Sequence, residues 1–462
     1  MVMLELEGKT VHFIGVGGIS CNALARFVLD FGGKVSGSDA KITPICNELR
    51  RLGATIYQGE NPNNVNADIV VFSTAIKRDN AELQKARELG VPIYERHEFL
   101  GEISKLFGAS VAVAGTHGKT STTAMLTHIL KKRNFPFLSM IGGESVSLGN
   151  YVNNTCVHKI SELKDCVFIA EACEYKRHML SVKSDVGVVT NVECDHPDCY
   201  ADITEVRDAF RTFLEKSKVK IASCEDMQNL FGIADKNPNE FCVTDGEKKF
   251  AFRLRDKNCE VYENGIYRTS FSLIDDGEYN YKNALFALCA SSILGVPLVD
   301  GASALKSYKG VKRRFERSAD IDNAKMFFDF AHHPKEISCV LERAKKYGKV
   351  LIVFQPHTYS RTKAYLDDFV QVLGGCDFCD DVVLMPVYAA RETPSTGVDS
   401  DVLAKAIFDK FPQKKVYLAK DARSTLDYVK SHAKDVDVIM MIGAGDIYDM
   451  KHFIECEKDK LS

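Results

Sequence analysis

Short apolar runs alternate with longer stretches of helical character along almost the whole chain. In the first block, the apolar run TVHFI at residues 10–14 turns into glycines, and the helix-like stretch 22–33 separates it from a β-prone run at 34–39. A strand, a helix and a strand in this order indicate a β-α-β unit of a parallel sheet. Further strands of this sheet are predicted at 54–59, 67–76 and 91–96.

Two further blocks repeat this alternation. The second begins at the apolar run SVAVAG and ends with the helix-like stretch 279–294, and the third begins after the basic turn KGVKRRFER. A chain of 462 residues is also too long for a single hydrophobic core. We therefore predict an α/β fold with three domains, at residues 1–108, 109–314 and 315–462.

Composition excludes several classes of partner. The formal net charge is only −3 and no long basic run occurs, so neither a nucleic acid nor an anionic membrane is expected as a partner. No apolar stretch approaches the roughly 18 residues of a membrane span, and the first residues lack the order of a secretory signal. We expect a cytoplasmic protein, a monomer or homodimer, that acts on small molecules.

The fifteen cysteines are scattered, and several lie inside apolar segments. This distribution predicts buried thiols rather than a disulfide framework. One CxxC occurs, from Cys376 to Cys379, but the second pair that a zinc site normally needs is not nearby.

The stretch VAVAGTHGKTSTT, residues 111–123, contains a Gly-Lys-Thr at the junction of a predicted strand and a predicted helix. The usual phosphate loop would have a glycine at Val113, whereas the other glycine here is Gly115. At such a junction, exposed amides and the positive helix end can face an anion. Lys119 would then neutralise terminal phosphates, and the hydroxyl of Thr120 would ligate magnesium. The alternative is an accidental Gly-Lys-Thr with the threonine as a helix cap.

A second glycine-rich turn reads Gly15-x-Gly17-Gly18-x-Ser20. The third glycine of the dinucleotide fingerprint is missing, although Asp39 falls about where the ribose-binding acid would lie. This turn is either part of a nucleotide site or an ordinary tight turn of a doubly wound domain.

Ten motifs, in order along the chain, together resemble the Mur ligases, the ATP-dependent enzymes that build the peptide of bacterial cell-wall precursors. They are HFIGVGGIS, SGSD, AGTHGKTSTT, IAEACEY, VVTNVECDHPDCY, YNYKNALFAL, GVKRRFE, DFAHHPKEI, FQPHTYSRTK and GAGDIY. The set most resembles the alanine-adding members of this family. The shortened loop AGTHGKT is thus the family's own form.

The resemblance implies a fold and a reaction. The fold would comprise a Rossmann-like UDP-binding domain, a central phosphate-loop ATPase domain with a mostly parallel sheet, and a Rossmann-like C-terminal domain. The reaction would join L-alanine to the lactoyl carboxylate of UDP-N-acetylmuramic acid through an acyl phosphate, with ATP and Mg²⁺, as the first peptide step of peptidoglycan precursor synthesis.

The resemblance also implies roles for single residues. Catalysis would involve Lys119, Glu171, His196 and Arg314. ATP would be bound by Gly115, Thr116, Gly118, Lys119, Thr120, Ser121, Asn283, Arg314 and Asp329. The metal ligands would be Thr120, Glu171 and His196. The UDP-sugar would contact Gly17, Gly18, Ser38, Asp39, Ser73, Thr74, Gly142 and Gly143. The amino acid would lie near Glu174, His332, His357 and Arg361, with Glu174 and His332 as two candidates for the general base.

Placement along the predicted elements agrees with part of this assignment. Glu171 ends one predicted strand and His196 follows another, so both can face the carboxyl edge of the sheet, where α/β proteins bind ligands. Asn283 shares a helix face with Asn280, three residues before it. A turn residue at His196 and a plain polar helix face at Asn283 are the alternatives.

Phe330 departs from the pattern, because many alanine-adding relatives have tyrosine in Asp-Tyr-Ala-His-His-Pro. Phenylalanine there also resembles the family's ligase that recycles a murein tripeptide, which is the alternative function. Two other classes remain. A nicotinamide-dependent oxidoreductase would use the GVGG turn and Asp39 but leaves AGTHGKT unexplained, and a non-catalytic nucleotide-binding module would not need the metal carboxylate.

Overall fold

The computed structural model describes residues 4–197, 199–233, 240–379, 381–390, 392 and 398–459. They divide into two compact units, one formed by the described residues of 1–195 and 199–311, and the other by those of 196–198 and 312–462. The first unit contains two sheets and the second unit contains one. Within these described ranges, no helix is both long and apolar enough to cross a membrane.

The N-terminal sheet has the strand order β3-β2-β1-β4-β5, and all its pairings are parallel. Each strand coincides with a run that the sequence predicts. Helix α2 shows a local cause of its start, because Thr43 accepts a hydrogen bond from the amide of Cys46 and Pro44 occupies the first turn. The elements are β1 (Thr10–Ile14), α1 (Ile19–Asp30), β2 (Lys34–Asp39), α2 (Pro44–Arg51), β3 (Thr55–Gln58), β4 (Ile69–Phe72), α3 (Ala81–Leu89), β5 (Ile93–Glu95) and α4 (Arg96–Ser104).

The central sheet has the order β15-β14-β13-β12-β11-β10-β6-β9-β7-β8. Its middle strands, β11-β10-β6-β9-β7, pair in parallel. The sequence predicts all of them except β7. Antiparallel strands extend it on both sides. The strands are β6 (Ala109–Ala114), β7 (Phe137–Ser145), β8 (Gly149–Asn153), β9 (Val167–Glu171), β10 (Val186–Val189), β11 (Val219–Ser223), β12 (Cys242–Thr244), β13 (Lys249–Arg255), β14 (Asn258–Glu263) and β15 (Ile266–Phe271).

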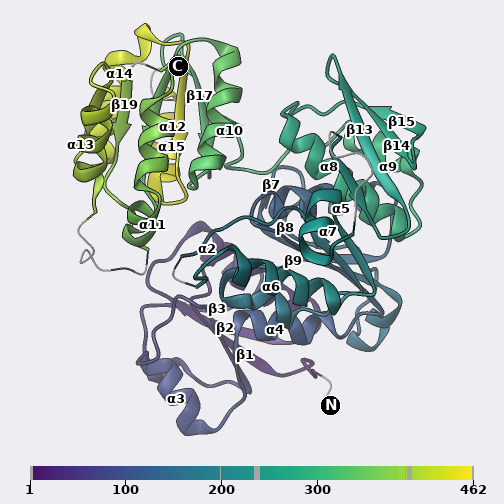
Figure 1. Cartoon of the computed structure of the whole chain (residues 1–462). Helices are drawn as coiled ribbons and strands as arrows, with labels where there is room; N and C mark the ends of the chain where they lie inside the picture. Colours follow the sequence, from purple (N-terminus) through teal and green to yellow (C-terminus); the bar gives the residue numbers. More distant parts are fainter. Residues whose placement is uncertain are drawn as a thin grey trace. The chain divides into compact units, whose positions relative to one another are not determined.

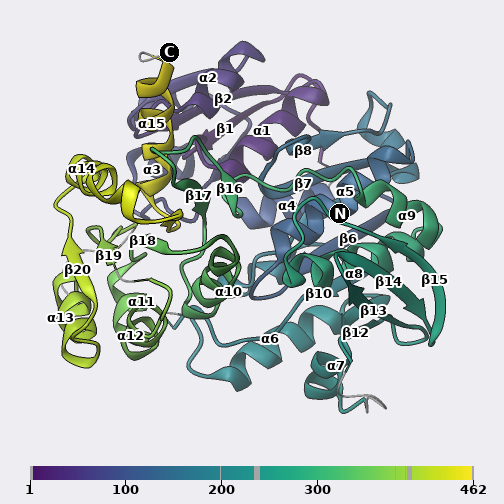
Figure 2. The same cartoon turned by 90° about the horizontal axis from the view of Figure 1, so that it is seen from above.

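Three helices, α5, α8 and α9, pack together beside the central sheet near the phosphate loop. Helix α5 packs against α8 and α9, and these two helices lie beside the antiparallel strands in both views (Figures 1 and 2). Their buried faces share one hydrophobic core with the parallel strands. The helices are α5 (Lys119–Lys132), η3 (Tyr175–Ser181, a 3₁₀ turn), α6 (Ile203–Glu215), α7 (Cys224–Phe231), α8 (Glu278–Ile293) and α9 (Leu298–Leu305).

The second unit is built on a sheet of order β16-β17-β21-β18-β19-β20, parallel except for the short edge strand β16. Two hydrophobic clusters cover its two faces. The elements are β16 (Glu316–Arg317), β17 (Lys325–Asp329), α10 (Pro334–Ala344), β18 (Val350–Phe354), α11 (Tyr359–Ala364), α12 (Leu366–Gly374), β19 (Asp381–Leu384), α13 (Ser400–Lys410), β20 (Lys415–Leu418), α14 (Ala422–His432), β21 (Val438–Ile442) and α15 (Met450–Asp459).

The cysteines match the expected picture with one addition. Most of them are buried or partly buried free thiols, such as Cys166 and Cys289 inside the first unit. The structure joins Cys376 to Cys379, the two ends of the CxxC, as a disulfide. Among the described side chains no other cysteine pair is bonded, so there is no disulfide framework in this part of the chain.

Candidate active site

The predicted phosphate loop lies at the carboxyl end of β6 and leads directly into α5. Gly118 is the N-cap of the helix with φ 82°, and Gly115 has φ 135°, a region that only glycine adopts readily. A Cβ at Gly115 would collide with the side chain of Thr190, and one at Gly118 with the amide of Asn283. The loop therefore needs both glycines for its shape and for its neighbours.

Residues after β10 hold this loop from one side. The side chain of Asn191 accepts from the amide of His117 and donates to its carbonyl, both at 2.9 Å. The amide of Thr116 donates to the carbonyl of Asn191, and the hydroxyl of Thr190 donates to the carbonyl of His117. Sequence reasoning did not assign Thr190 and Asn191. Their position after a strand beside the loop strand was the signal that could have found them.

Lys119 is nearly enclosed, with 13% of its side chain exposed. Its ammonium lies 2.8 Å from a carboxylate oxygen of Glu174 and donates to the carbonyls of Gly115 and Thr116. Burial by itself lowers the pKa of Lys119, but the carboxylates of Glu174 and Glu171 outweigh it and raise the pKa above its ordinary value. Lys119 therefore stays protonated at the loop, where it balances the charge of nearby carboxylates.

Thr120 and Glu171 meet beside this charge. The Thr120 hydroxyl donates to Glu171 Oε2 at 2.7 Å, and the amide of Gly142 donates to the same oxygen at 3.1 Å. A Cβ at Gly142 would overlap the Glu171 carboxylate, and one at Gly143 would lie 2.9 Å from Thr120 Cγ2. Two oxygen donors at this spacing suit a hard cation such as Mg²⁺, so the residues present fit that ion.

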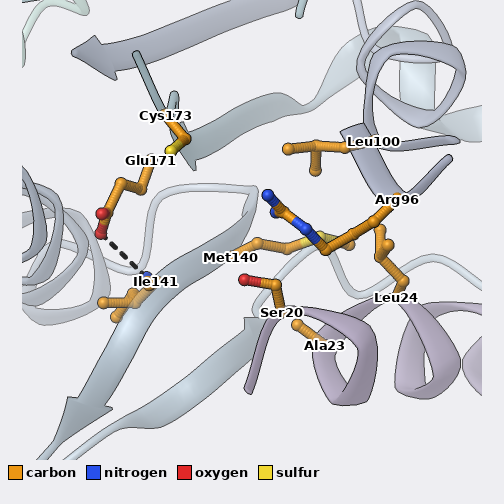
Figure 3. A pocket seen from close by; sticks show the side chains of 10 residues that line it. Ser20, Ala23, Leu24, Arg96, Leu100, Met140, Ile141, Glu171 and Cys173 are labelled. Carbon is orange, nitrogen blue, oxygen red and sulfur yellow. Dashed lines mark hydrogen bonds between the residues drawn. The ribbon is translucent and has the colours of Figure 1, made fainter. Parts of the chain in front are cut away.

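A pocket of about 130 Å³ opens from Glu171 between the two sheets of the first unit. Helices α1 and α4 form one wall, and β7 with the segment after β9 forms the other (Figure 3). In Figure 3 the guanidinium of Arg96 and the hydroxyl of Ser20 point into the pocket, whereas Glu171 reaches toward the backbone of β7. Its lining residues are Ser20, Ala23, Leu24, Arg96, Leu100, Met140, Ile141, Gly142, Glu171 and Cys173.

Arg96 is a candidate that sequence reasoning missed. It begins α4, directly after a short strand, and no motif marks it. An arginine in a small pocket can bind a carboxylate or a phosphate through two parallel hydrogen bonds. The pocket is therefore suited to an anionic small molecule.

Asn283 lies as the sequence analysis expects, on the same helix as Asn280. Both asparagines are buried on α8, and Asn283 stands beside Gly118 at the start of α5. Ser121 lies in the first turn of α5. These residues surround the positive end of that helix.

The predicted UDP-sugar residues of the N-terminal domain lie at the carboxyl ends of β1, β2 and β4. The amide of Gly17 donates to Asp39 Oδ2 at 2.9 Å, and Gly18 is the N-cap of α1. Ser73 and Thr74 follow β4 directly, and the Ser73 hydroxyl accepts from the amide of Ala75. This edge is where open α/β sheets bind ligands.

Ser38 differs from its neighbours on this edge. Its side chain is buried, and its hydroxyl donates to the carboxylate of Glu82. Glu82 also accepts from the amides of Asn61 and Asn64, and lies 3.7 Å from the ring of His12. Ser38 therefore supports the sheet edge from inside, while Asp39 faces the glycine turn.

In the second unit, three predicted amino-acid-binding residues come together. The rings of His332 and His357 have centroids 5.4 Å apart, and Arg361 Nη1 lies 3.4 Å from His357 Nδ1. Arg361 is buried in α11, so its position is not that of an exposed helix-start residue. Glu174, the fourth predicted residue, belongs to the first unit, where it pairs with Lys119.

Burial and then the nearby charge of Arg361 lower the pKa of His357 to about 4. The unfolded chain takes up this proton near pH 6.5 and the folded chain only near pH 4, so acidification through this window favours unfolding. Between pH 7 and pH 4 the free energy of unfolding of the native chain should fall further than that of His357→Gln. We expect the two decreases to differ by roughly 2 to 3 kcal/mol.

The urea midpoint of each protein, measured at both pH values, checks this expectation. His452→Gln, at an exposed position of the same unit, is the control. Equal losses of stability in the His357 variant and the native chain would contradict it.

Arg314, Asp329 and Phe330 form one cluster in the second unit. Both carboxylate oxygens of Asp329 accept from backbone amides, those of Phe315 and Ala331, and burial raises its pKa to about 6. The Phe330 ring lies under the guanidinium of Arg314, 5.3 Å from it, and meets His332 edge-on. The phenylalanine therefore supports the arginine and the histidine through its ring faces.

His196 belongs to the second unit, with φ 55° and an electrostatic influence on His357. It lies several residues after the end of β10 and groups with the second unit, so the expectation that it faces the same sheet edge as Glu171 stays a prediction. The predicted roles of His196 at magnesium and of Arg314 and Asp329 at ATP also stay predictions.

Three family models match consecutive parts of the chain. They are the Mur ligase family catalytic domain at residues 10–108, the Mur ligase middle domain at 113–291, and the Mur ligase glutamate ligase domain at 313–445. Together they span most of the chain.

Individual relatives match over nearly their whole length. A UDP-N-acetylmuramate–L-alanine ligase of Caldanaerobacter subterraneus is 36% identical over 471 residues, covering 98% of this chain and 99% of its own. An enzyme of the same name from Acetivibrio thermocellus is 37% identical over 457 residues, covering 95% and 94%.

Solved structures agree with these matches. The UDP-N-acetylmuramate-alanine ligase of Thermotoga maritima has a TM-score of 0.79 at 27% identity, covering 98% of this chain and all of its own. A murein peptide ligase of Psychrobacter arcticus has a TM-score of 0.72 at 21% identity, covering 97% and 98%, which is a likeness of fold. The chain belongs to the Mur ligase family.

Proposed function

We propose that the chain joins L-alanine to the lactoyl carboxylate of UDP-N-acetylmuramic acid, with ATP converted to ADP and phosphate. This is an ATP-dependent acid–amino-acid ligase reaction in peptidoglycan precursor synthesis, and we place it in the cytoplasm. The full-length likeness to enzymes named for this reaction supports the proposal.

The observation that carries the proposal is that Glu171 contacts both the phosphate loop and the pocket. This carboxylate accepts from Thr120 of the phosphate loop and also lines the pocket that contains Arg96. A nucleotide phosphate at the loop and an acid in the pocket would therefore be neighbours. That is the arrangement needed to transfer a phosphoryl group from one to the other.

The chemistry has two steps. A carboxylate oxygen of the acceptor attacks the γ-phosphorus of ATP, the bond to the β-phosphate oxygen breaks, and ADP leaves. The alanine amine then attacks the acyl carbon, phosphate departs and the amine loses a proton. Lys119 stabilises the negative charge on the transferring oxygens, and Arg96 orients the acceptor acid. Glu174 and His332 remain the two candidates for accepting the proton.

Magnesium would be held by Thr120 and Glu171, with His196 added on the family pattern alone. Bound there, the ion would neutralise phosphate charge and align the reacting oxygens. The remaining assignments follow the family pattern too: ATP at Gly115, Thr116, Gly118, Ser121, Asn283, Arg314 and Asp329, the UDP-sugar at Gly17, Gly18, Ser38, Asp39, Ser73, Thr74, Gly142 and Gly143, and alanine at His332, His357 and Arg361. The three proposed domains are residues 1–108, 109–314 and 315–462.

The test is phosphate release from ATP and Mg²⁺ with each acceptor and amine omitted in turn, and with mass spectrometry of the product. We expect release only when UDP-N-acetylmuramic acid and L-alanine are both present, and a product heavier by one alanyl residue. Release that instead requires a murein tripeptide would assign the chain to the recycling reaction, for which Phe330 is the one residue in favour. An NAD(P)H absorbance change without phosphate release would reject both.

A further inference from the structure

A second cluster of metal-ligand side chains lies outside the reaction site. Glu95, His97 and His178 each offer one ligand atom, and these atoms all lie within 4.8 Å of one another. The residues come from the end of β5, the first turn of α4 and the 3₁₀ turn η3. The cluster therefore joins the N-terminal sheet to the central sheet inside the first unit.

One distance within the cluster approaches that between two ligands of one ion. His178 Nε2 lies 3.6 Å from Glu95 Oε1. In a tetrahedral zinc site with bonds near 2.0 Å, neighbouring ligand atoms lie about 3.3 Å apart. The three ligand atoms, all within 4.8 Å of one another, would move closer together around a bound ion.

In the part of the chain that the structure describes, two buried polar atoms of the cluster have no hydrogen bond to satisfy them. Glu95 Oε1 and His97 Nδ1 are buried atoms, and within the described chain neither has a hydrogen-bond partner. Such atoms are costly unless something satisfies them.

The backbone around the cluster is fixed, so the ligands are positioned in advance. A Cβ at Gly101 of α4 would collide with the carbonyl of Ser181, which shows how closely α4 packs on η3. The Ser104 hydroxyl accepts from the amide of Lys183 at 2.8 Å, and Lys176 and Arg177 hold left-handed conformations that turn the chain into His178.

We propose that Glu95, His97 and His178 form a binding site for one borderline divalent cation of the zinc type. Two imidazoles and one carboxylate are the donors that Zn²⁺ accepts, whereas Mg²⁺ prefers oxygen alone. Glu95 and His97 flank Arg96 in the sequence, and His178 follows Glu174 by four residues. The bound ion would therefore stabilise both α4 and the segment after β9, which belong to opposite walls of the substrate pocket. It is separate from the magnesium position at Thr120 and Glu171.

The test is metal binding by the full chain, produced without a histidine tag, stripped with a chelator and titrated with Co²⁺ and Zn²⁺. We expect one equivalent to bind, with visible Co²⁺ bands but without the near-ultraviolet band of thiolate ligation. Zn²⁺ should also raise the thermal midpoint. Glu95→Gln and His97→Gln should each weaken binding at least tenfold, and His158→Gln, an exposed histidine of the same unit, should not.

Circular dichroism verifies that each variant is folded before titration. Unchanged binding in both folded variants, no stoichiometric binding in the native chain, or a thiolate band would overturn the proposal. None of these readouts depends on ligase activity, so the proposed reaction stands or fails separately.

Discussion

Lys119→Ala should lower the rate of ATP-dependent phosphate release by about 1000-fold or more. The variant would lose the cation that faces the transferring phosphate in the proposed reaction, and it would leave the carboxylates of Glu174 and Glu171 without their neutralising partner. Because the elevated pKa keeps this lysine charged throughout the working range, the loss should be the same at every pH. Initial rates of phosphate release with saturating L-alanine and UDP-sugar are the measurement.

Lys132→Ala is the matched control, since Lys132 is an exposed lysine near the end of the same helix. We expect its rate to stay within about twofold of the native chain. Binding of the UDP-sugar, measured by calorimetry, should survive in both variants because its predicted contacts lie on the N-terminal sheet edge and on β7. An active Lys119→Ala variant would be incompatible with the proposed reaction.

The second large effect is expected at Glu171. Glu171→Gln keeps the size and the polar contacts to Thr120 and Gly142 but removes the negative charge that the cation would meet. We expect kcat to fall about 100- to 1000-fold and the Mg²⁺ concentration for half-maximal activity to rise about tenfold.

The measurement is the rate of product formation across a Mg²⁺ titration, and Glu162→Gln, an exposed carboxylate of the same unit, serves as the reference. A lower kcat with an unchanged Mg²⁺ requirement would show that Glu171 positions the acceptor instead of the ion. A native rate would remove Glu171 from the mechanism.

Much of the fold could be predicted because its signals are local. Many parallel strands of the three sheets, such as β6, β10, β18 and β21, are short apolar runs that the sequence marks clearly. Strands β7, β8 and β12–β15 were missed. Polar, charged or glycine residues interrupt β7, β8, β13, β14 and β15, and β12 has only three residues, so no long apolar run marks them. Their pairing is decided by neighbours along the sheet rather than by local sequence.

The candidate site divides in the same way. Lys119, Thr120 and Glu171 could be brought together from sequence, because the loop and the end of β9 share one sheet edge. Sequence could not predict three other features of the site. They are the contact of Lys119 with Glu174, the close approach of Gly142 to the Glu171 carboxylate, and the position of Arg96 in the pocket. These depend on the path of the chain after β9 and on the packing of α4, which bring together residues far apart in sequence.

The pairing of Lys119 with Glu174 has a consequence for nucleotide affinity. If ATP binds at this loop as proposed, its terminal phosphate competes with the carboxylate of Glu174 for the ammonium of Lys119. Part of the binding free energy of ATP would then be spent on displacing Glu174, and a chain without this carboxylate should bind ATP more tightly. The same displacement would release the carboxylate of Glu174, one of the two candidate proton acceptors, from Lys119. A cost in nucleotide affinity and a proton acceptor for the second step would then be two results of one exchange.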